Sequence, residues 1–113
     1  MFGFGRGPKV ENLGIEDIKK GLADGSILLV DVREPNEWEA GHIAGAVLFP
    51  LSTFDAAALP DPQGRRIVFS CRSGKRSLTA AAAAAAGGVT VDAHYAGGML
   101  DWVQHGEPVA TGP

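Results

Sequence analysis

Cysteine is scarce in this chain, because Cys71 is the single one among 113 residues. A lone cysteine cannot form a disulfide within the chain, and it cannot supply a cysteine cluster for zinc. His94 and His105 show no metal-ligand spacing, so we assign them to ordinary packing and expect no metal site. Cys71 is therefore either an inert packing residue or a residue that takes part in chemistry.

Long hydrophobic runs are also missing. No stretch of about 18 uninterrupted apolar residues exists, and the N-terminal sequence MFGFGRGPKV lacks the apolar segment of a secretory signal. We therefore expect a cytoplasmic protein without membrane contact. The length allows one domain, which we place at residues 9–110, after a flexible glycine-rich leader of residues 1–8 and before a C-terminal tail of residues 111–113.

Acidic residues are absent between Pro62 and Val91, whereas this stretch holds half of the ten basic residues of the chain. They are Arg65, Arg66, Arg72, Lys75 and Arg76. The net charge of the whole chain is −3, which argues against a nucleic-acid partner. A basic segment around the only cysteine fits either a local binding site for an anion or a solvated turn, and charge alone leaves both open.

The hydrophobic pattern predicts strands that alternate with helices. The expected strands are residues 10–13, 27–32, 43–49, 65–70 and 89–94, and the expected helices are residues 15–22, 35–40, 51–59, 77–86 and 99–104. The segment 27–32, ILLVDV, is a continuous aliphatic run typical of a central parallel strand buried on both faces. The alternation predicts an α/β domain with a mainly parallel central sheet of about five strands, flanked by helices on both faces.

The segment CRSGKRS, residues 71–77, links the end of a predicted strand to the start of a helix. Ligands of parallel α/β sheets bind beyond the carboxyl ends of strands, and the free amides of a helix start attract anions. Gly74 allows the positive φ that a tight loop requires, and Ser77 is a good N-cap. We therefore expect Cys71 to be an exposed thiolate at neutral pH, since helix starts and cations lower the pKa of cysteine. The alternative is a buried, unreactive side chain.

Three groups of residues resemble signatures of the rhodanese family, and together they extend from about Val10 to Val109. They are DVRE at 31–34 with Glu37-Trp38, GHIAGA at 41–46 and Pro50; CRSGKRS at 71–77; and GGMLDW at 97–102 with GEPV at 106–109. The chain thus resembles a single-domain rhodanese-like sulfurtransferase, and the resemblance implies the rhodanese-like fold.

The resemblance also implies covalent sulfur transfer. A cysteine at the position of Cys71 would attack a small anionic sulfur donor such as thiosulfate and become a persulfide, which would pass its outer sulfur to cyanide or another thiophile. Ping-pong kinetics follow from this scheme, and no cofactor is needed. Loop amides would hold the persulfide and basic side chains would attract the donor. The residues concerned are Arg72, Ser73, Gly74, Lys75, Arg76 and Ser77.

Three further residues are expected to support the site. Asp31 and Arg33 end a buried strand near it, and we expect Asp31 to organise loops by hydrogen bonding rather than to act as a base. His42 is a candidate base, but the resemblance favours a structural role in a turn, because GHI is a turn feature of the family and persulfide chemistry needs no base once the thiolate exists.

The length of the cysteine loop and the presence of Cys71 distinguish between alternative functions. Cysteine phosphatases, including relatives with the rhodanese fold, place five residues between cysteine and arginine, whereas four lie between Cys71 and Arg76. The smaller loop disfavours a tetrahedral phosphate or arsenate. Non-catalytic rhodanese-like scaffolds usually lack the cysteine, so the presence of Cys71 argues against that class. A sulfur-relay or interaction module, loaded by the persulfide of a partner protein, would use the same cysteine, so the sequence leaves it open beside the enzyme.

Overall fold

The computed structural model describes residues 9–113, which form an α/β fold around one five-stranded sheet. The strands are β1 (Glu11–Leu13), β2 (Ile27–Asp31), β3 (Val47–Leu48), β4 (Arg66–Ser70) and β5 (Ala93–Tyr95). The sheet order is β1-β5-β4-β2-β3, and all neighbouring strands are parallel. The predicted fold class is confirmed, with a sheet that is parallel throughout.

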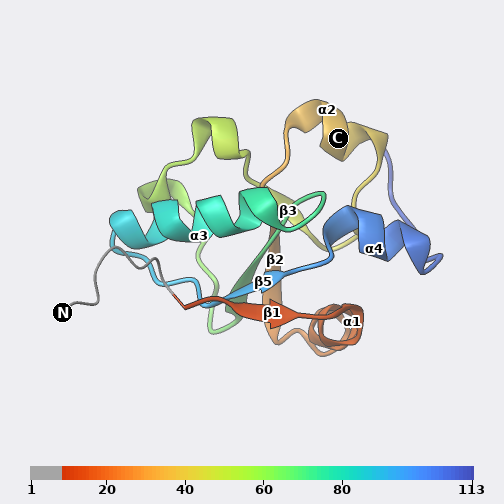
Figure 1. The fold of residues 1–113 in the computed structure, drawn as a ribbon, viewed down its shortest axis with the longest axis horizontal. Coiled ribbons are helices and arrows are strands. Elements are labelled where there is room, and N and C mark those ends of the chain that lie inside the picture. The colour runs from red at the N-terminus through yellow and green to blue at the C-terminus, as the bar shows by residue number, and fades with distance from the viewer. Residues whose placement is uncertain (1–8) are drawn as a thin grey trace.

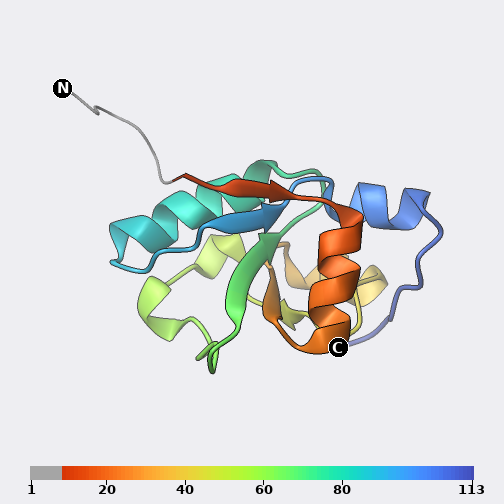
Figure 2. The same ribbon diagram turned by 90° about the horizontal axis from the view of Figure 1, so that it is seen from below.

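Helices cover both faces of the sheet, as Figures 1 and 2 show. They are α1 (Ile15–Asp24), α2 (Pro35–Ala40), α3 (Lys75–Ala86) and α4 (Gly98–Gln104). α1 and α4 contribute Ile18 and Trp102 to the core on one face, while α3 packs on the other face. Every residue of β2 is buried, because this inner strand carries apolar side chains toward both layers. Within residues 9–113, none of the helices has the length and apolar character needed to cross a membrane.

The alanine-rich helix α3 packs against the sheet through small side chains. Ala80, Ala81 and Ala84 are fully buried, whereas Ala82 on the outer side is exposed. The helix ends at the glycine pair 87–88. Because α3 follows β4 directly, its N-terminus lies at the carboxyl edge of the sheet.

The strand expected at residues 43–49 is much shorter in the structure, where β3 contains Val47 and Leu48 alone. Gly45 adopts a left-handed backbone with φ +93°, and the chain turns there. Ile43 before the turn is 3% exposed and belongs to the core. Ile43 therefore fills the core from a turn, which a hydrophobic pattern alone does not distinguish from a strand.

The helix expected at residues 51–59 is replaced by two 3-10 turns, Leu51–Thr53 and Ala56–Ala58. Phe54 between them packs against the core cluster on the α3 side of the sheet. The carboxylate of Asp55 accepts a hydrogen bond from an amide of the second turn. This side-chain cap starts a new turn, so one continuous helix does not form.

The predicted leader, residues 1–8, lies outside the described residues. At the other end of the chain, the C-terminal segment is hydrogen-bonded to α2 and to the turn that follows it. His42 and Ala110 form an isolated antiparallel bridge with hydrogen bonds of 2.9 and 2.8 Å. The amide of Gly112, in the predicted tail, donates to the carbonyl of Glu39 at 2.9 Å. These bonds place the end of the chain next to α2.

Candidate active site

Cys71 lies directly after β4, at the carboxyl edge of the sheet, where the chain turns into α3. The start of α4 holds this turn. The amide of Met99 donates to the carbonyl of Cys71 at 2.9 Å, and the amide of Leu100 donates to that of Arg72 at 3.1 Å. Gly98 has φ +61°, and a Cβ atom there would collide with the same two carbonyls. The loop after β4 is therefore held from outside by α4.

The sulfur of Cys71 faces backbone amides of its own loop. The amide of Gly74 donates to Sγ at 3.1 Å and that of Ser77 at 3.4 Å, and the hydroxyl oxygen of Ser77 lies 3.6 Å from Sγ. Gly74 has φ +92°, and a Cβ atom there would overlap the carbonyl of Ala96, so this position requires glycine. The loop thus directs the positive ends of peptide dipoles at the sulfur.

Cys71 is buried, so the predicted exposure of the thiol is wrong. The residue is 1% exposed, because the loop wraps over the sulfur and α3 covers it from the core side. Burial raises the pKa of the thiol, but the hydrogen bond with the Ser77 side chain and those from the amides of Ser77, Ser73 and Gly74 outweigh it. The net effect lowers the pKa of Cys71. The loop therefore favours a buried thiolate. A reactant would reach the sulfur from the surface beside the loop.

Ser77 lies inside α3, so its predicted role as N-cap is wrong. Gly74 occupies the N-cap position, because its left-handed backbone begins the helix there. Ser77 is fully buried, and its hydroxyl lies between two partners, Sγ of Cys71 and Nδ1 of His94, the latter at 2.7 Å. The hydroxyl therefore belongs to the site rather than to a helix cap.

The basic side chains of the loop lie in two different settings. Arg72 and Lys75 are exposed, and so is Ser73. Arg76 instead donates to both carboxylate oxygens of Glu37 on α2, at 2.7 and 2.9 Å. These bonds lower the pKa of Glu37 to about 2. Arg76 thus connects α3 to α2, and Arg72 and Lys75 are the loop cations exposed to solvent.

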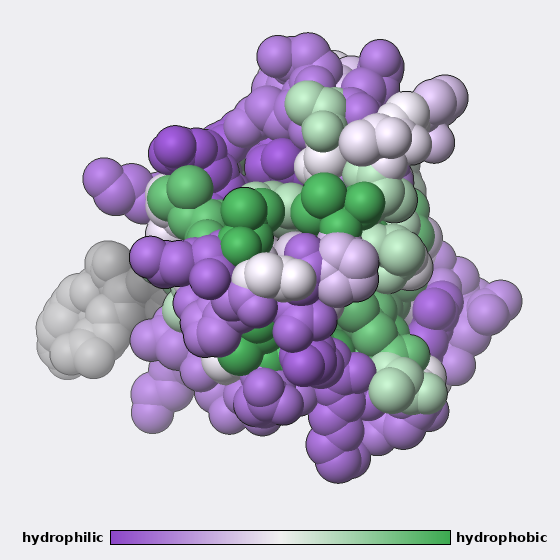
Figure 3. Space-filling model, turned by 90° about the vertical axis from the view of Figure 1, so that its right-hand side faces the viewer, coloured by the Kyte–Doolittle hydropathy of each residue, from purple (hydrophilic) through white to green (hydrophobic). Residues whose placement is uncertain are grey.

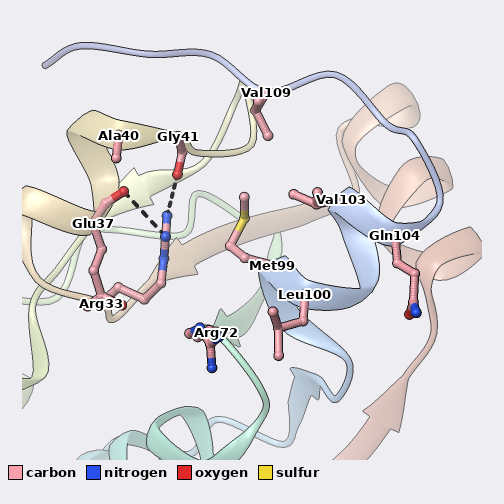
Figure 4. A pocket seen from close by; sticks show the side chains of 10 residues that line it. All are labelled: Arg33, Glu37, Ala40, Gly41, Arg72, Met99, Leu100, Val103, Gln104 and Val109. Carbon is pink, nitrogen blue, oxygen red and sulfur yellow. Dashed lines mark hydrogen bonds between the residues drawn. The ribbon is translucent and has the colours of Figure 1, made fainter.

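Asp31 and Arg33 form a buried ion pair at the end of β2. Arg33 Nη2 lies 2.7 Å from Asp31 Oδ2, and the two residues are 3% and 5% exposed. The guanidinium also donates to the carbonyls of Gly41 at 2.8 Å and Glu37 at 3.4 Å, as Figure 4 shows. The pair therefore fixes α2 and the turn after it to the carboxyl edge of the sheet.

His42 contacts α2 and the C-terminal segment. Its ring stacks on Trp38 with the ring centroids 3.7 Å apart, and its Nδ1 donates to the carbonyl of Trp38 at 2.7 Å. Its backbone forms the bridge to Ala110. These contacts fix the turn after α2 and do not involve the cysteine loop.

An apolar groove of about 690 Å³ lies beside the loop. Met99, Leu100 and Val103 of α4 line it on one side, Val109 comes from the C-terminal segment, and Arg72 lies at its edge (Figure 4). Figure 3 looks onto this end of the molecule, where hydrophobic side chains gather among hydrophilic ones. The groove offers an apolar surface for the body of a reactant next to the cysteine loop.

His94 is buried, as expected for a packing residue, and hydrogen bonds connect it to Asn12 and to Ser77 of the cysteine loop. Nε2 of His94 lies 2.7 Å from Oδ1 of Asn12, and Nδ1 lies beside the Ser77 hydroxyl. β5 places His94 opposite Phe69, two residues before the cysteine. A histidine in an apolar strand is the only signal that the sequence offers for this contact. Within residues 9–113, no group of His, Cys, Asp and Glu side chains could hold a metal ion.

Residues 15–105 match the family model of the rhodanese-like domain. The chain belongs to the rhodanese family. It is similar to the thiosulfate:glutathione sulfurtransferase of Saccharomyces cerevisiae, with 32% identity over 86% of this chain and 81% of that protein. An uncharacterized protein of Synechocystis is 40% identical over 74% of this chain, which spans 46% of the length of that protein.

A solved structure shows the same rhodanese fold in a related enzyme. The human single-domain sulfurtransferase superimposes with a TM-score of 0.69 and 31% identity, over 82% of this chain and 95% of that one. Further relatives also carry the name sulfurtransferase. These similarities place the chain among the rhodanese-like sulfurtransferases.

Proposed function

We propose that this rhodanese-like domain moves sulfane sulfur from thiosulfate to a thiophile through a persulfide on Cys71. The thiolate attacks the outer sulfur of thiosulfate, a bond to Sγ forms, and the bond to the sulfonate sulfur breaks, so that sulfite leaves with the electron pair. A thiophile such as cyanide then attacks the outer sulfur of the persulfide. Thiocyanate leaves, and the electron pair of the broken bond returns to Cys71 as a thiolate.

The observation that carries this proposal is the set of amides directed at Sγ. The amides of Gly74 and Ser77, at 3.1 and 3.4 Å, stabilise negative charge on Cys71 when it attacks and again when it leaves. The exposed cations Arg72 and Lys75 raise the local concentration of a dianion such as thiosulfate. Neither displacement removes a proton, so the scheme needs no base at Asp31 or His42.

The groove beside the loop favours a thiophile larger than cyanide. Leu100 and Val103 give it apolar walls, and Arg72 places a guanidinium at its edge. A peptide thiol such as glutathione has a body to lie in such a groove and carboxylates to pair with a guanidinium. The yeast relative is named for transfer to glutathione. We therefore propose thiols as acceptors beside cyanide, with the acceptor thiolate attacking and leaving as its own persulfide.

Sulfur relay between proteins is the second candidate function. Leu100, Val103 and Val109 are 47%, 57% and 44% exposed, and all three line the groove next to the cysteine loop. A partner protein that covers these side chains would bring its own persulfide or thiol to Cys71. Donor and acceptor would then both be proteins, and turnover of small molecules would be incidental.

Steady-state kinetics test the proposal. With thiosulfate as donor, we expect formation of thiocyanate and of glutathione persulfide, parallel lines in double-reciprocal plots, and loss of both activities in Cys71→Ser. Converging lines, or activity that survives in Cys71→Ser, would contradict the covalent scheme. Slow turnover with thiosulfate combined with rapid loading from a protein persulfide would favour the relay.

A further inference from the structure

His94 is buried beneath the cysteine loop and has no part in the scheme above. It is 2% exposed, with Nδ1 2.7 Å from Ser77 Oγ and Nε2 2.7 Å from Asn12 Oδ1. Ser77 Oγ lies in turn 3.6 Å from Cys71 Sγ. Four side chains from β1, β5, α3 and the loop after β4 therefore form one continuous chain of hydrogen-bonding groups, which ends at the sulfur.

The directions of these hydrogen bonds follow from Asn12. Its Oδ1 accepts, so Nε2 of His94 carries a hydrogen, and Nδ1 of the neutral ring carries a lone pair. The Ser77 hydroxyl then donates its single hydrogen to Nδ1, which leaves an oxygen lone pair facing the sulfur. This arrangement suits a Cys71 thiol that donates to Ser77. While the His94 ring is neutral, the thiolate that the loop amides favour therefore receives no hydrogen from the Ser77 hydroxyl.

We propose that His94 is the proton acceptor for Cys71 and is reached through the hydroxyl of Ser77. The S–H bond of Cys71 breaks and its proton goes to Ser77 Oγ, while the hydroxyl hydrogen of Ser77 moves to His94 Nδ1. The Ser77 hydroxyl now donates to the thiolate, and Nδ1–H donates to Ser77. Nothing is oxidised, and one proton has moved from sulfur to nitrogen. The inference rests on Cys71 being the nucleophile of the proposed function. It adds that His94 holds the proton that the Cys71 thiol has lost.

Burial makes the two protonation states depend on each other. An imidazolium among neutral groups is unfavourable, and burial lowers the pKa of His94. The direct partners of the ring, Ser77 and Asn12, carry no charge. A thiolate at Cys71 supplies the compensating negative charge, so the cysteine and the histidine titrate as a pair.

Two cations of the cysteine loop and the start of α3, Arg72 and Lys75, are exposed, and further charged side chains around this pair are engaged with partners. They are Arg76 with Glu37, Arg66 with Glu11 and Asp92, Arg33 with Asp31, and Asp101 with the hydroxyl of Tyr95. Arg76 is close enough to Cys71 for a negative charge on the sulfur to help raise the pKa of the guanidinium, after the larger effect of Glu37. Tyr95 points away from His94, since neighbouring residues of a strand face opposite sides of the sheet. None of these groups contacts the His94 ring. The Cys71 thiolate, linked to the ring through Ser77, is therefore the charge that affects the protonation of His94.

Nitrogen-15 NMR of the histidine rings tests the inference on the full chain. At neutral pH we expect His94 to carry hydrogens on both ring nitrogens in the wild type, where the ultraviolet absorbance of Cys71 shows a thiolate. In Cys71→Ala the ring should be neutral at the same pH, because no anion offsets its burial. A ring with unprotonated Nδ1 in the wild type while the thiolate is present, or the same titration midpoint in both proteins, would overturn the proposal.

Substitutions of the bridge give an independent readout. In Ser77→Ala and His94→Asn, we expect the rate of iodoacetamide alkylation at neutral pH to fall roughly 10-fold, the effect of losing one hydrogen bond to a charged group. Ser77→Thr keeps the hydroxyl and should retain the rate. Equal alkylation rates in Ser77→Ala and Ser77→Thr would contradict proton transfer through the Ser77 hydroxyl. The comparison with Cys71→Ala does not depend on whether these variants fold. A failure of thiosulfate to load Cys71 would leave the NMR titration unaffected, so the two proposals fail separately.

Discussion

Replacing Glu37 by glutamine removes one charge from the Arg76–Glu37 pair and keeps the shape of the side chain. The two contacts of 2.7 and 2.9 Å hold the pKa of Glu37 at about 2, against 4.5 for the unperturbed group. At about 1.36 kcal/mol per pKa unit, the full difference corresponds to about 3 kcal/mol of stability. Because the two side chains are 33% and 26% exposed, screening by water reduces the expected loss to about 1–2 kcal/mol.

The difference in stability between wild type and Glu37→Gln depends on pH with a definite sign. The folded pKa lies below the unfolded one, so the contribution is fully present above pH 4.5 and is lost as the pH falls from 4.5 toward about 2. Urea unfolding across this range measures it. Glu39→Gln, an exposed position of the same helix, is the matched control and should change the unfolding free energy by less than about 0.5 kcal/mol.

The same substitution leaves Arg76 without its carboxylate beside the cysteine. The positive potential at Sγ then rises, so the pKa of Cys71 should fall further and alkylation below neutral pH should become faster in Glu37→Gln. An unchanged unfolding free energy would refute the assigned role of the pair. A loss of the same size at neutral pH and near pH 2 would show that the effect is not that of a charge.

Three further predictions concern packing and the groove. Gly74→Ala should lower the free energy of unfolding by about 2–3 kcal/mol and abolish rapid alkylation of Cys71, because the new Cβ atom adds steric overlap to a positive φ. Gly88→Ala is the control: φ is +84° but the site is open, so thermal unfolding should show a loss of about 1 kcal/mol. Ala84→Leu should lower the free energy of urea unfolding by about 1–3 kcal/mol, because residue 84 is fully buried against the sheet. Ala82→Leu, on the exposed side of the same helix, should leave that free energy nearly unchanged. Leu100→Ser should raise the KM for glutathione and leave the KM for cyanide unchanged, and equal changes for both would contradict the acceptor groove.

The sequence was a good guide to elements that are bounded by strong local signals. β2 was expected at residues 27–32 and lies at Ile27–Asp31, and α4 was expected at residues 99–104 and lies at Gly98–Gln104. The errors at 43–49 and 51–59 arose where one glycine or one aspartate redirects the backbone inside an apolar segment. Such local reversals leave the hydrophobic pattern intact, so the pattern does not reveal them.

A candidate site could be proposed from the sequence, but its depth and its partners could not. The order of a strand end, a glycine and three cations led to the loop of Cys71 as the candidate. The burial of the sulfur depends on how α3 and α4 close around that loop, and the contact of Ser77 with His94 depends on β5 lying next to β4. Likewise, the pairing of Arg76 with Glu37 joins residues far apart in the chain. Strand order and long-range pairing are properties of the assembled fold.

Mass spectrometry of the intact chain tests the nucleophilic role of Cys71 most directly. After treatment with thiosulfate, the wild type should gain the mass of one sulfur atom, cyanide should remove it, and Cys71→Ser should show no gain. An unchanged mass of the wild type, or an equal gain in Cys71→Ser, would contradict the account.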